Sequence, residues 1–305
     1  MATTSQDIGL ANPAVARADR GGSRAAAWAG ALRRQAAPGR IAALLLLWAL
    51  TVLALYPLVW LVTNSLKSAS EMFDRSWALP EIWQWENYAK AWGFGLGQYI
   101  VNSVLVTTAS VTLIVLIGAL SAFVLTVLHF PGKKLVYGMI LGGLILPPEV
   151  SLFPLFKILT TLGLYNTYGA MILPYVAFGL PFTTFLLRAY MTTIPTELHE
   201  AAIVDGASLL RIFWSIYLPV SRPALASAAL IMGMRVWNEF IFALTFVESN
   251  DLRTLTIGIS TFGDALRLDW AVLMAGLVIS IVPVLGTFLL MQRQFIGGLT
   301  QGAVK

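Results

Sequence analysis

Six long apolar stretches alternate with shorter polar segments along the chain. The first stretch, residues 41–63, contains 23 residues and no charge, and residues 99–128 are also uncharged. Because a helix rises about 1.5 Å per residue, about 20 apolar residues cross the roughly 30 Å hydrocarbon core of a membrane. The other four stretches are residues 135–159, 168–187, 223–247 and 270–291. The pattern predicts an all-α integral membrane protein with six transmembrane helices.

Two of the stretches contain features that a lipid-facing helix avoids. Pro147-Pro148 interrupts the third stretch and is followed by Glu149, so we expect a helix break there. The fifth stretch carries Arg235 and Glu239, which lie four residues apart. On one continuous helix these side chains can pair and neutralise each other, and this is the role that we expect for them. The alternative is a polar lining for a solute path.

The composition supports a membrane location. Hydrophobic residues make up 58% of the 305 residues and charged residues only 11%, with a mean hydropathy of +0.77. Soluble domains carry about 25% charged residues. The chain has no cysteine, which excludes disulfides, thiolate metal sites and thiol nucleophiles. The net charge of +5 does not indicate a nucleic-acid partner, because the basic residues are scattered over short loops.

Lysines and arginines determine the predicted orientation. With the N-terminus inside, the inner segments hold thirteen of the 20 basic residues and the outer segments hold six, while Arg235 lies within a span. Because cytoplasmic loops are enriched in Lys and Arg, both termini and residues 192–222 are predicted to be cytoplasmic. Residues 1–40 carry six arginines and no sustained apolar periodicity, which predicts a disordered basic arm. The transmembrane domain is then residues 41–305.

Two outer segments are large enough for a second role. Residues 64–98 contain four tryptophans, which suit a membrane-interface belt or a docking surface. Residues 248–269 contain four acids and two arginines. Either segment can equally be a solvated connector.

No energy source is encoded in the chain itself. The phosphate-binding pattern GxxxxGK[ST] is absent, as are HExxH and GxSxG. We therefore expect a transport subunit that is not an enzyme and binds no cofactor or metal, with energy supplied by another chain. Glu149, beside a proline break, keeps an ion-coupled secondary carrier as the alternative class, although such carriers usually have more intramembrane acids. Whether uptake needs ATP or an ion gradient separates the two classes.

The segment between the fourth and fifth stretches predicts two short helices. Pro195 suits the first turn of one helix, and Asp205-Gly206 ends it, because glycine readily takes a positive φ. Ser208 can cap a second helix, which we expect Pro219 to end. The apolar stripe of this second helix is Leu209, Ile212, Phe213 and Ile216. The product is a helix–turn–helix elbow that can transmit the motion of a docked partner to two spans. A plain interfacial elbow without a partner is the alternative.

Seven residues of this elbow match a known motif at fixed spacing. They follow the pattern E-A-A-x3-G-x9-I-x-L-P and are Glu200, Ala201, Ala202, Gly206, Ile216, Leu218 and Pro219. The elbow thus resembles the EAA loop in the permease subunits of binding-protein-dependent ABC importers. Residues 145–223, the run Trp237-Asn238-Glu239-Phe240 and the tail 292–305 resemble the carbohydrate branch, in particular the second permease of maltose-type systems. The first 40 residues match no family in this way.

The resemblance implies a type I ABC importer permease fold in the inner membrane of a prokaryote. It further implies a second permease subunit, two ATPase subunits that bind ATP and magnesium, and an extracytoplasmic binding protein that delivers a sugar. The elbow is then the cytoplasmic coupling helix between spans four and five, with Glu200 facing a basic residue of an ATPase and Asp205 beside the turn at Gly206. The tail is expected between the ATPases, and the 248–269 loop against the binding protein. A glycerol phosphodiester, a polyol or another solute stays open as cargo, because the motif reports coupling only.

Six residues are candidates for the sugar path. Aromatic rings can stack on sugar rings and polar groups can bond hydroxyls, although aromatic residues in membrane spans more often serve packing. The candidates are Tyr175, Phe178, Arg235, Trp237, Asn238 and Glu239. The resemblance also implies that the partner permease carries many of the sugar contacts.

Overall fold

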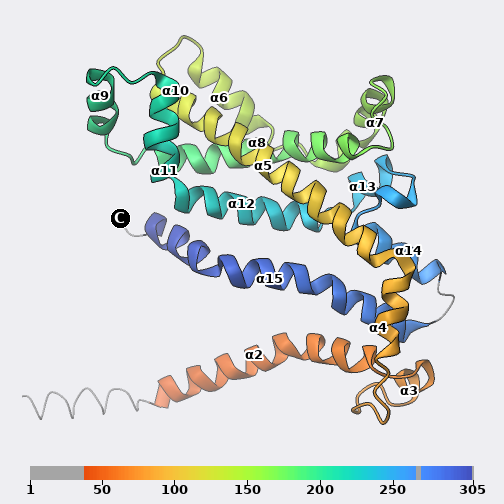
Figure 1. Ribbon diagram of the computed structural model, residues 1–305. Coiled ribbons are helices and arrows are strands. Elements are labelled where there is room, and N and C mark those ends of the chain that lie inside the picture. Colours follow the sequence, from red (N-terminus) through yellow and green to blue (C-terminus); the bar gives the residue numbers. More distant parts are fainter. Residues whose placement is uncertain (1–37, 266–268, 304–305) are drawn as a thin grey trace, which may run out of the picture. The chain divides into compact units, whose positions relative to one another are not determined.

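The computed structural model describes residues 38–265 and 269–303 of the chain (Figure 1). The regular elements within these ranges are all helices, and no strand occurs among them. The chain divides into two compact units, residues 1–60 and Leu61–Lys305. The predicted basic arm, residues 1–40, lies almost wholly outside the described residues and stays a prediction.

The first apolar stretch forms a single helix. This helix, α2, covers Pro38–Ser65 and contains Pro57 in its interior. Its portion Ile41–Ser65 is long and apolar enough to cross a membrane. The first predicted span is therefore present as a helix of spanning length.

Three helices pack together at the centre of the second unit. The helices α5 (Gly97–Val127) and α8 (Tyr168–Met191) pack along each other, and α12 (Arg222–Trp237) packs against both (Figure 1). The second and fourth apolar stretches were predicted to be spans, and they coincide with α5 and α8. The last helix, α15 (Trp270–Ala303), packs on α12 and on the short α4 (Glu86–Ala91).

Two glycines allow α5 and α8 to approach each other closely. A Cβ added at Gly179 of α8 lies 2.6 Å from the Cδ1 atom of Ile114 on α5. A Cβ added at Gly118 of α5 lies 2.6 Å from the Cγ2 atom of Thr183 on α8. Both distances are shorter than any normal carbon–carbon contact. The helices α5 and α8 can therefore lie this close only because glycine has no side chain at these two positions.

Replacing Gly179 by leucine is expected to destabilise the protein. Ile114 is fully buried, so the added side chain must force α5 and α8 apart, at a cost of about 1–3 kcal/mol. The measurement is the thermal denaturation midpoint of the purified, assembled transporter in detergent. Gly138→Leu is the control, because nothing lies within 4 Å of a Cβ added at Gly138. If the two variants have equal midpoints, close packing at Gly179 does not contribute to stability.

The third apolar stretch is broken as predicted, and the fifth is broken unexpectedly. After α6 (Lys133–Gly142), a 3₁₀ turn at Pro148–Ser151 leads into α7 (Leu152–Thr161). In the fifth stretch α12 ends at Trp237, and α13 (Ile241–Phe246) begins after three non-helical residues. The prediction of one continuous helix at residues 223–247 is therefore wrong. The chain then forms α14 (Leu255–Ala265) before α15.

The described helices support a membrane protein that crosses the bilayer several times. By length and composition, three of them can span it, and these are Ile41–Ser65, Glu86–Val127 and Tyr168–Met191. A fourth span results if Leu209–Val220 and Arg222–Trp237, which meet at 77°, act as one bent helix pair. The count of six spans and the position of both termini in the cytoplasm stay predictions.

Candidate functional site

The predicted turn at Gly206 is present and has a defined hydrogen-bond pattern. The helix α9 (Thr196–Val204) ends there, and Gly206 has a φ of +77°. The Gly206 N–H donates to the Ile203 carbonyl and the Ala207 N–H donates to the Ala202 carbonyl, both at 2.9 Å. These two bonds form a Schellman motif, which ends a helix at a left-handed residue. Glycine is needed at position 206 because of its positive φ and not because of crowding, since no atom lies within 4 Å of an added Cβ.

The helix α9 has an inward and an outward side. Ala202 and Ala207 are half-buried and pack against the core cluster that contains Phe213. Glu200, Ala201 and Asp205 are exposed. The structure thus divides the E-A-A triplet, because the second alanine packs on the protein body while the glutamate and the first alanine remain accessible.

The second helix of the elbow begins as predicted. The Ser208 hydroxyl accepts a hydrogen bond from the Arg211 N–H (3.3 Å) and caps α10 (Leu209–Ile212). A wider helical turn at Phe213–Tyr217 then leads into α11 (Leu218–Val220).

Aromatic rings fix this second helix to the protein body. The rings of Phe213 and Tyr217 lie 5.3 and 5.0 Å from the ring of Phe123 on α5. Of the predicted apolar stripe, Ile212 and Phe213 are buried and Ile216 is half-buried, whereas Leu209 is exposed. Of the remaining motif residues, Leu218 and Pro219 are both half-buried. The second helix of the elbow is therefore packed on α5.

The second helix of the elbow ends one residue later than predicted. Pro219 lies near the end of the helical segment Leu209–Val220, which continues to Val220. The chain bends by 77° at Ser221, before α12 begins. The Ser221 side chain is fully buried, and its hydroxyl has no hydrogen-bond partner within the described part of the chain. The bend lies directly between the elbow and α12.

A cavity of about 250 Å³ lies at the other end of α12, beside the two broken stretches. It is lined by Pro148, Glu149, Tyr175, Phe178, Gly179, Met232, Arg235, Val236, Glu239 and Phe242. Four of the six predicted sugar-path residues therefore lie together here. The sequence pattern also missed Phe242, whose ring is 5.6 Å from that of Phe178.

The expected ion pair between Arg235 and Glu239 is not present. Glu239 lies beyond the end of α12, and its carboxylate accepts hydrogen bonds from the Tyr175 hydroxyl (2.6 Å) and from the N–H groups of Phe242 (2.9 Å) and Ala243 (3.2 Å). A carboxylate at the first turn of α13 is favourable, because the N–H groups there lack helical partners. Because the helix breaks after Trp237, Arg235 and Glu239 do not lie on one continuous helix and do not form the predicted pair.

Arg235 is left as the accessible cation of the cavity. Its side chain is exposed, and it forms no hydrogen bond or ion pair with any described residue. Trp237 and Asn238 do not line the cavity. Trp237 packs with Leu96 and Val272, and the Asn238 amide donates to the Met234 carbonyl (2.8 Å).

Two asparagines that the sequence analysis did not single out hold the loop at residues 247–254. The Asn102 amide donates to the carbonyls of Asp251 (2.7 Å) and Arg253 (2.9 Å). The Asn166 carbonyl oxygen accepts from the N–H groups of Glu248 (3.0 Å) and Ser249 (2.9 Å). Asn102 could have been identified from the sequence, because it is an amide within an otherwise apolar stretch. A buried amide needs a hydrogen-bond partner.

The arrangement of the helices matches that of a chain in a solved ABC transporter. The chain superimposes on a chain from the crystal structure of a bacterial ABC transporter involved in the import of the acidic polysaccharide alginate. The TM-score is 0.73 and the identity 23%, over 84% of this chain and 95% of that chain. At this identity the likeness concerns the fold alone.

Sequence comparison then identifies the family. Residues 114–294, which contain both the elbow and the cavity, match the family described as binding-protein-dependent transport system inner membrane component. The chain is 45% identical to the probable ABC transporter permease protein YurM of Bacillus subtilis (82% of this chain, 83% of the relative). It is 37% identical to the diacetylchitobiose uptake system permease protein NgcG of Streptomyces coelicolor (86% and 87%). The chain belongs to this family of ABC transporter permeases, whose members leave ATP hydrolysis to a separate protein.

Proposed function

We propose that this chain is the second permease subunit of a sugar ABC importer. It forms half of the translocation path, beside a different permease subunit, and receives a sugar from an extracytoplasmic binding protein. The observation that carries the proposal is the elbow, whose exposed helix α9 is followed by a packed second helix, a bend and then α12. The sugar transported by the 37%-identical relative supports a carbohydrate as cargo.

Energy enters at α9 in this proposal. The exposed Glu200 contacts a basic residue of an ATPase subunit, and the small side chain of Ala201 lets that subunit approach the backbone. Because Phe213 and Tyr217 fix the second helix on α5, a displacement of α9 moves the body of the permease as well. ATP-driven closure of the ATPase subunits then changes the orientation of α12 and of the cavity at its far end.

The cavity is the part of the sugar path that this chain contributes. Arg235 and Glu149 are both exposed in it and can bond sugar hydroxyls, while Phe178 offers an apolar ring face. Glu239 is occupied by its three hydrogen bonds and acts on the path by holding Tyr175 and α13 in position. Trp237 and Asn238 support the cavity from outside its lining.

The test of coupling is the charge reversal Glu200→Lys. We expect normal membrane insertion but at least about tenfold slower sugar uptake into proteoliposomes, because a like-charge contact at an interface costs several kcal/mol. The cargo is first identified by screening sugars and polyols against the associated binding protein. Glu197→Lys, the same change one turn earlier on α9, is the matched control and should retain most uptake. Unchanged uptake by the Glu200 variant would exclude the coupling role.

A further inference from the structure

An exposed aromatic surface lies on the segment that follows α2. We define residues 73–85 as the aromatic loop. Six of its large apolar side chains are between 52% and 75% exposed, and these are Phe73, Trp77, Leu79, Ile82, Trp83 and Trp85. The other outer loop, residues 247–254, exposes no large apolar side chain. An apolar surface of this density in a short segment indicates a binding surface and is unusual for a solvated connector.

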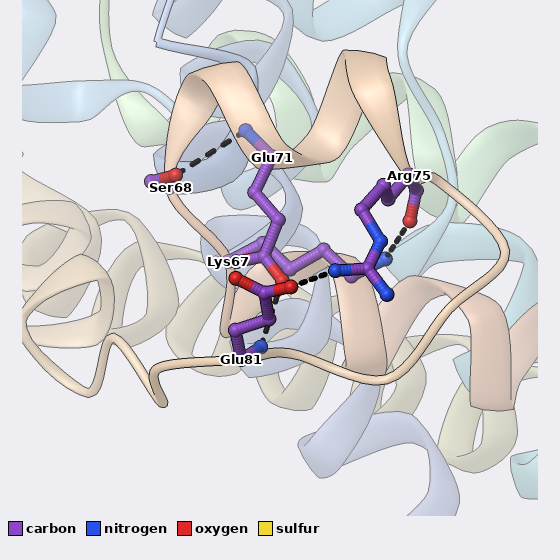
Figure 2. A network of polar contacts seen from close by, with 5 residues as sticks. All are labelled: Lys67, Ser68, Glu71, Arg75 and Glu81. Atoms are coloured by element: carbon purple, nitrogen blue, oxygen red, sulfur yellow. Dashed lines mark hydrogen bonds and ion pairs between the residues drawn. The ribbon is translucent and has the colours of Figure 1, made fainter.

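A buried polar network holds the aromatic loop in one conformation (Figure 2). Lys67 is fully buried, and its ammonium group donates to the Asn64 carbonyl oxygen (3.1 Å) and to the Arg75 carbonyl (2.8 Å). Burial lowers the pKa of Lys67, so the lysine is kept there at an electrostatic cost. The Ser68 hydroxyl caps the short helix α3 (Ala69–Asp74). The buried polar side chains of Asn64 and Lys67 thus lie beneath a segment whose large apolar side chains are exposed.

Two exposed charged side chains of the aromatic loop pair with each other. Arg75 forms an ion pair with Glu81, as Figure 2 shows. The Glu81 N–H in turn donates to the Glu71 carboxylate (2.8 Å). Because Arg75 and Glu81 neutralise each other, this part of the loop can enter a medium of low polarity at a smaller desolvation cost.

The loop is folded back on the point where α2 ends. The Gln84 N–H donates to the Leu66 carbonyl (2.8 Å), so the end of the loop lies beside its beginning. The Asn87 amide closes the same junction by donating to the carbonyls of Ser65 and Lys67, both at 2.9 Å. Since Ile41–Ser65 crosses the hydrocarbon, Leu66 lies at the membrane boundary, and the aromatic loop cannot project from it as an extended arm.

We propose that the aromatic loop lies in the lipid headgroup layer and anchors the end of α2 at the membrane surface. Tryptophan is enriched at this depth, because its ring is apolar and its N–H still reaches water or headgroups. The loop supplies three exposed tryptophans, an internal ion pair and a fold that begins at the membrane boundary. The occupant of the aromatic surface is therefore phospholipid. This proposal depends on the membrane location of α2 and is independent of the coupling role of the elbow.

The absence of cysteine from the chain permits a direct depth measurement. Single cysteines are introduced by Ile82→Cys and Leu79→Cys on the aromatic loop and by Asn250→Cys on the polar outer loop as the control. Each is labelled with a nitroxide in the assembled transporter, with cysteine-free partner chains, in liposomes of phosphatidylethanolamine and phosphatidylglycerol. The readout is the ratio of collisions with oxygen, which concentrates in lipid, to collisions with a water-soluble nickel chelate.

We expect this ratio to be severalfold higher at positions 79 and 82 than at position 250, with or without the binding protein. Equal ratios at all three positions would mean that the aromatic loop is in water and that the proposal is wrong. It is equally wrong if the labels avoid both reagents, which indicates burial against a protein subunit, or if the binding protein is needed to shield them. If one of the two loop variants does not assemble, the other loop position tests the proposal in the same way.

Discussion

The variant Gly206→Pro is expected to reach the membrane and to lose sugar uptake. Gly206 has a φ of +77°, whereas proline is restricted to about −65°, so the turn between α9 and α10 cannot form. Proline also lacks the N–H that donates to the Ile203 carbonyl. The local cost is about 1–3 kcal/mol, which is too small to prevent insertion of the apolar helices. Uptake into proteoliposomes should nevertheless fall at least about tenfold, because α9 no longer presents Glu200 in a fixed position.

Gly163 offers a closely matched control. It also has a positive φ, of +68°, its N–H donates to the carbonyl three residues earlier, and nothing lies within 4 Å of an added Cβ. Gly163→Pro therefore imposes the same backbone conflict outside the elbow. We expect it to lower the denaturation midpoint about as much as Gly206→Pro while uptake persists. If both variants lose uptake in parallel with their stability, the effect at Gly206 is structural and the coupling interpretation fails.

The elbow was predictable because its geometry depends on neighbours in sequence. The turn at Gly206 and the cap at Ser208 involve bonds between residues three to five apart. Such local rules of helix termini act before any long-range contact forms. Apolar stretches of sufficient length likewise predicted α2, α5 and α8, since a membrane requires a minimum helix length.

The cavity was less predictable because its lining comes from segments far apart in the chain. Nothing in the local sequence around Glu239 shows that Tyr175 will donate to its carboxylate, or that α13 will begin just after it. The pattern indicated the helix break at Pro147-Pro148 but gave no sign of the break after Trp237, where no proline occurs. The end of the second helix of the elbow was predicted at Pro219, whereas the helix continues to Val220 and the chain bends at Ser221.

The two broken helices and the elbow are connected through α12. One end of α12 begins at the bend after the elbow, and its other end contributes Met232, Arg235 and Val236 to the cavity. In the proposed function, motion of the elbow reaches the cavity through this one helix, without a contiguous chain of side-chain rearrangements.

The variant Glu239→Ala is expected to destabilise the transporter more than changes at Tyr175 or Arg235. It removes the acceptor for three hydrogen bonds and leaves the buried Tyr175 hydroxyl and two N–H groups of α13 without partners. The expected loss is on the order of 3 kcal/mol, seen as a lower denaturation midpoint. Tyr175→Phe removes only one of these bonds and should cost less.

Arg235→Ala removes no hydrogen bond or ion pair to a described residue, so it should leave the midpoint unchanged and raise the KM for sugar uptake. A lower midpoint for Arg235→Ala, or an unchanged one for Glu239→Ala, would reverse the roles assigned to these two side chains.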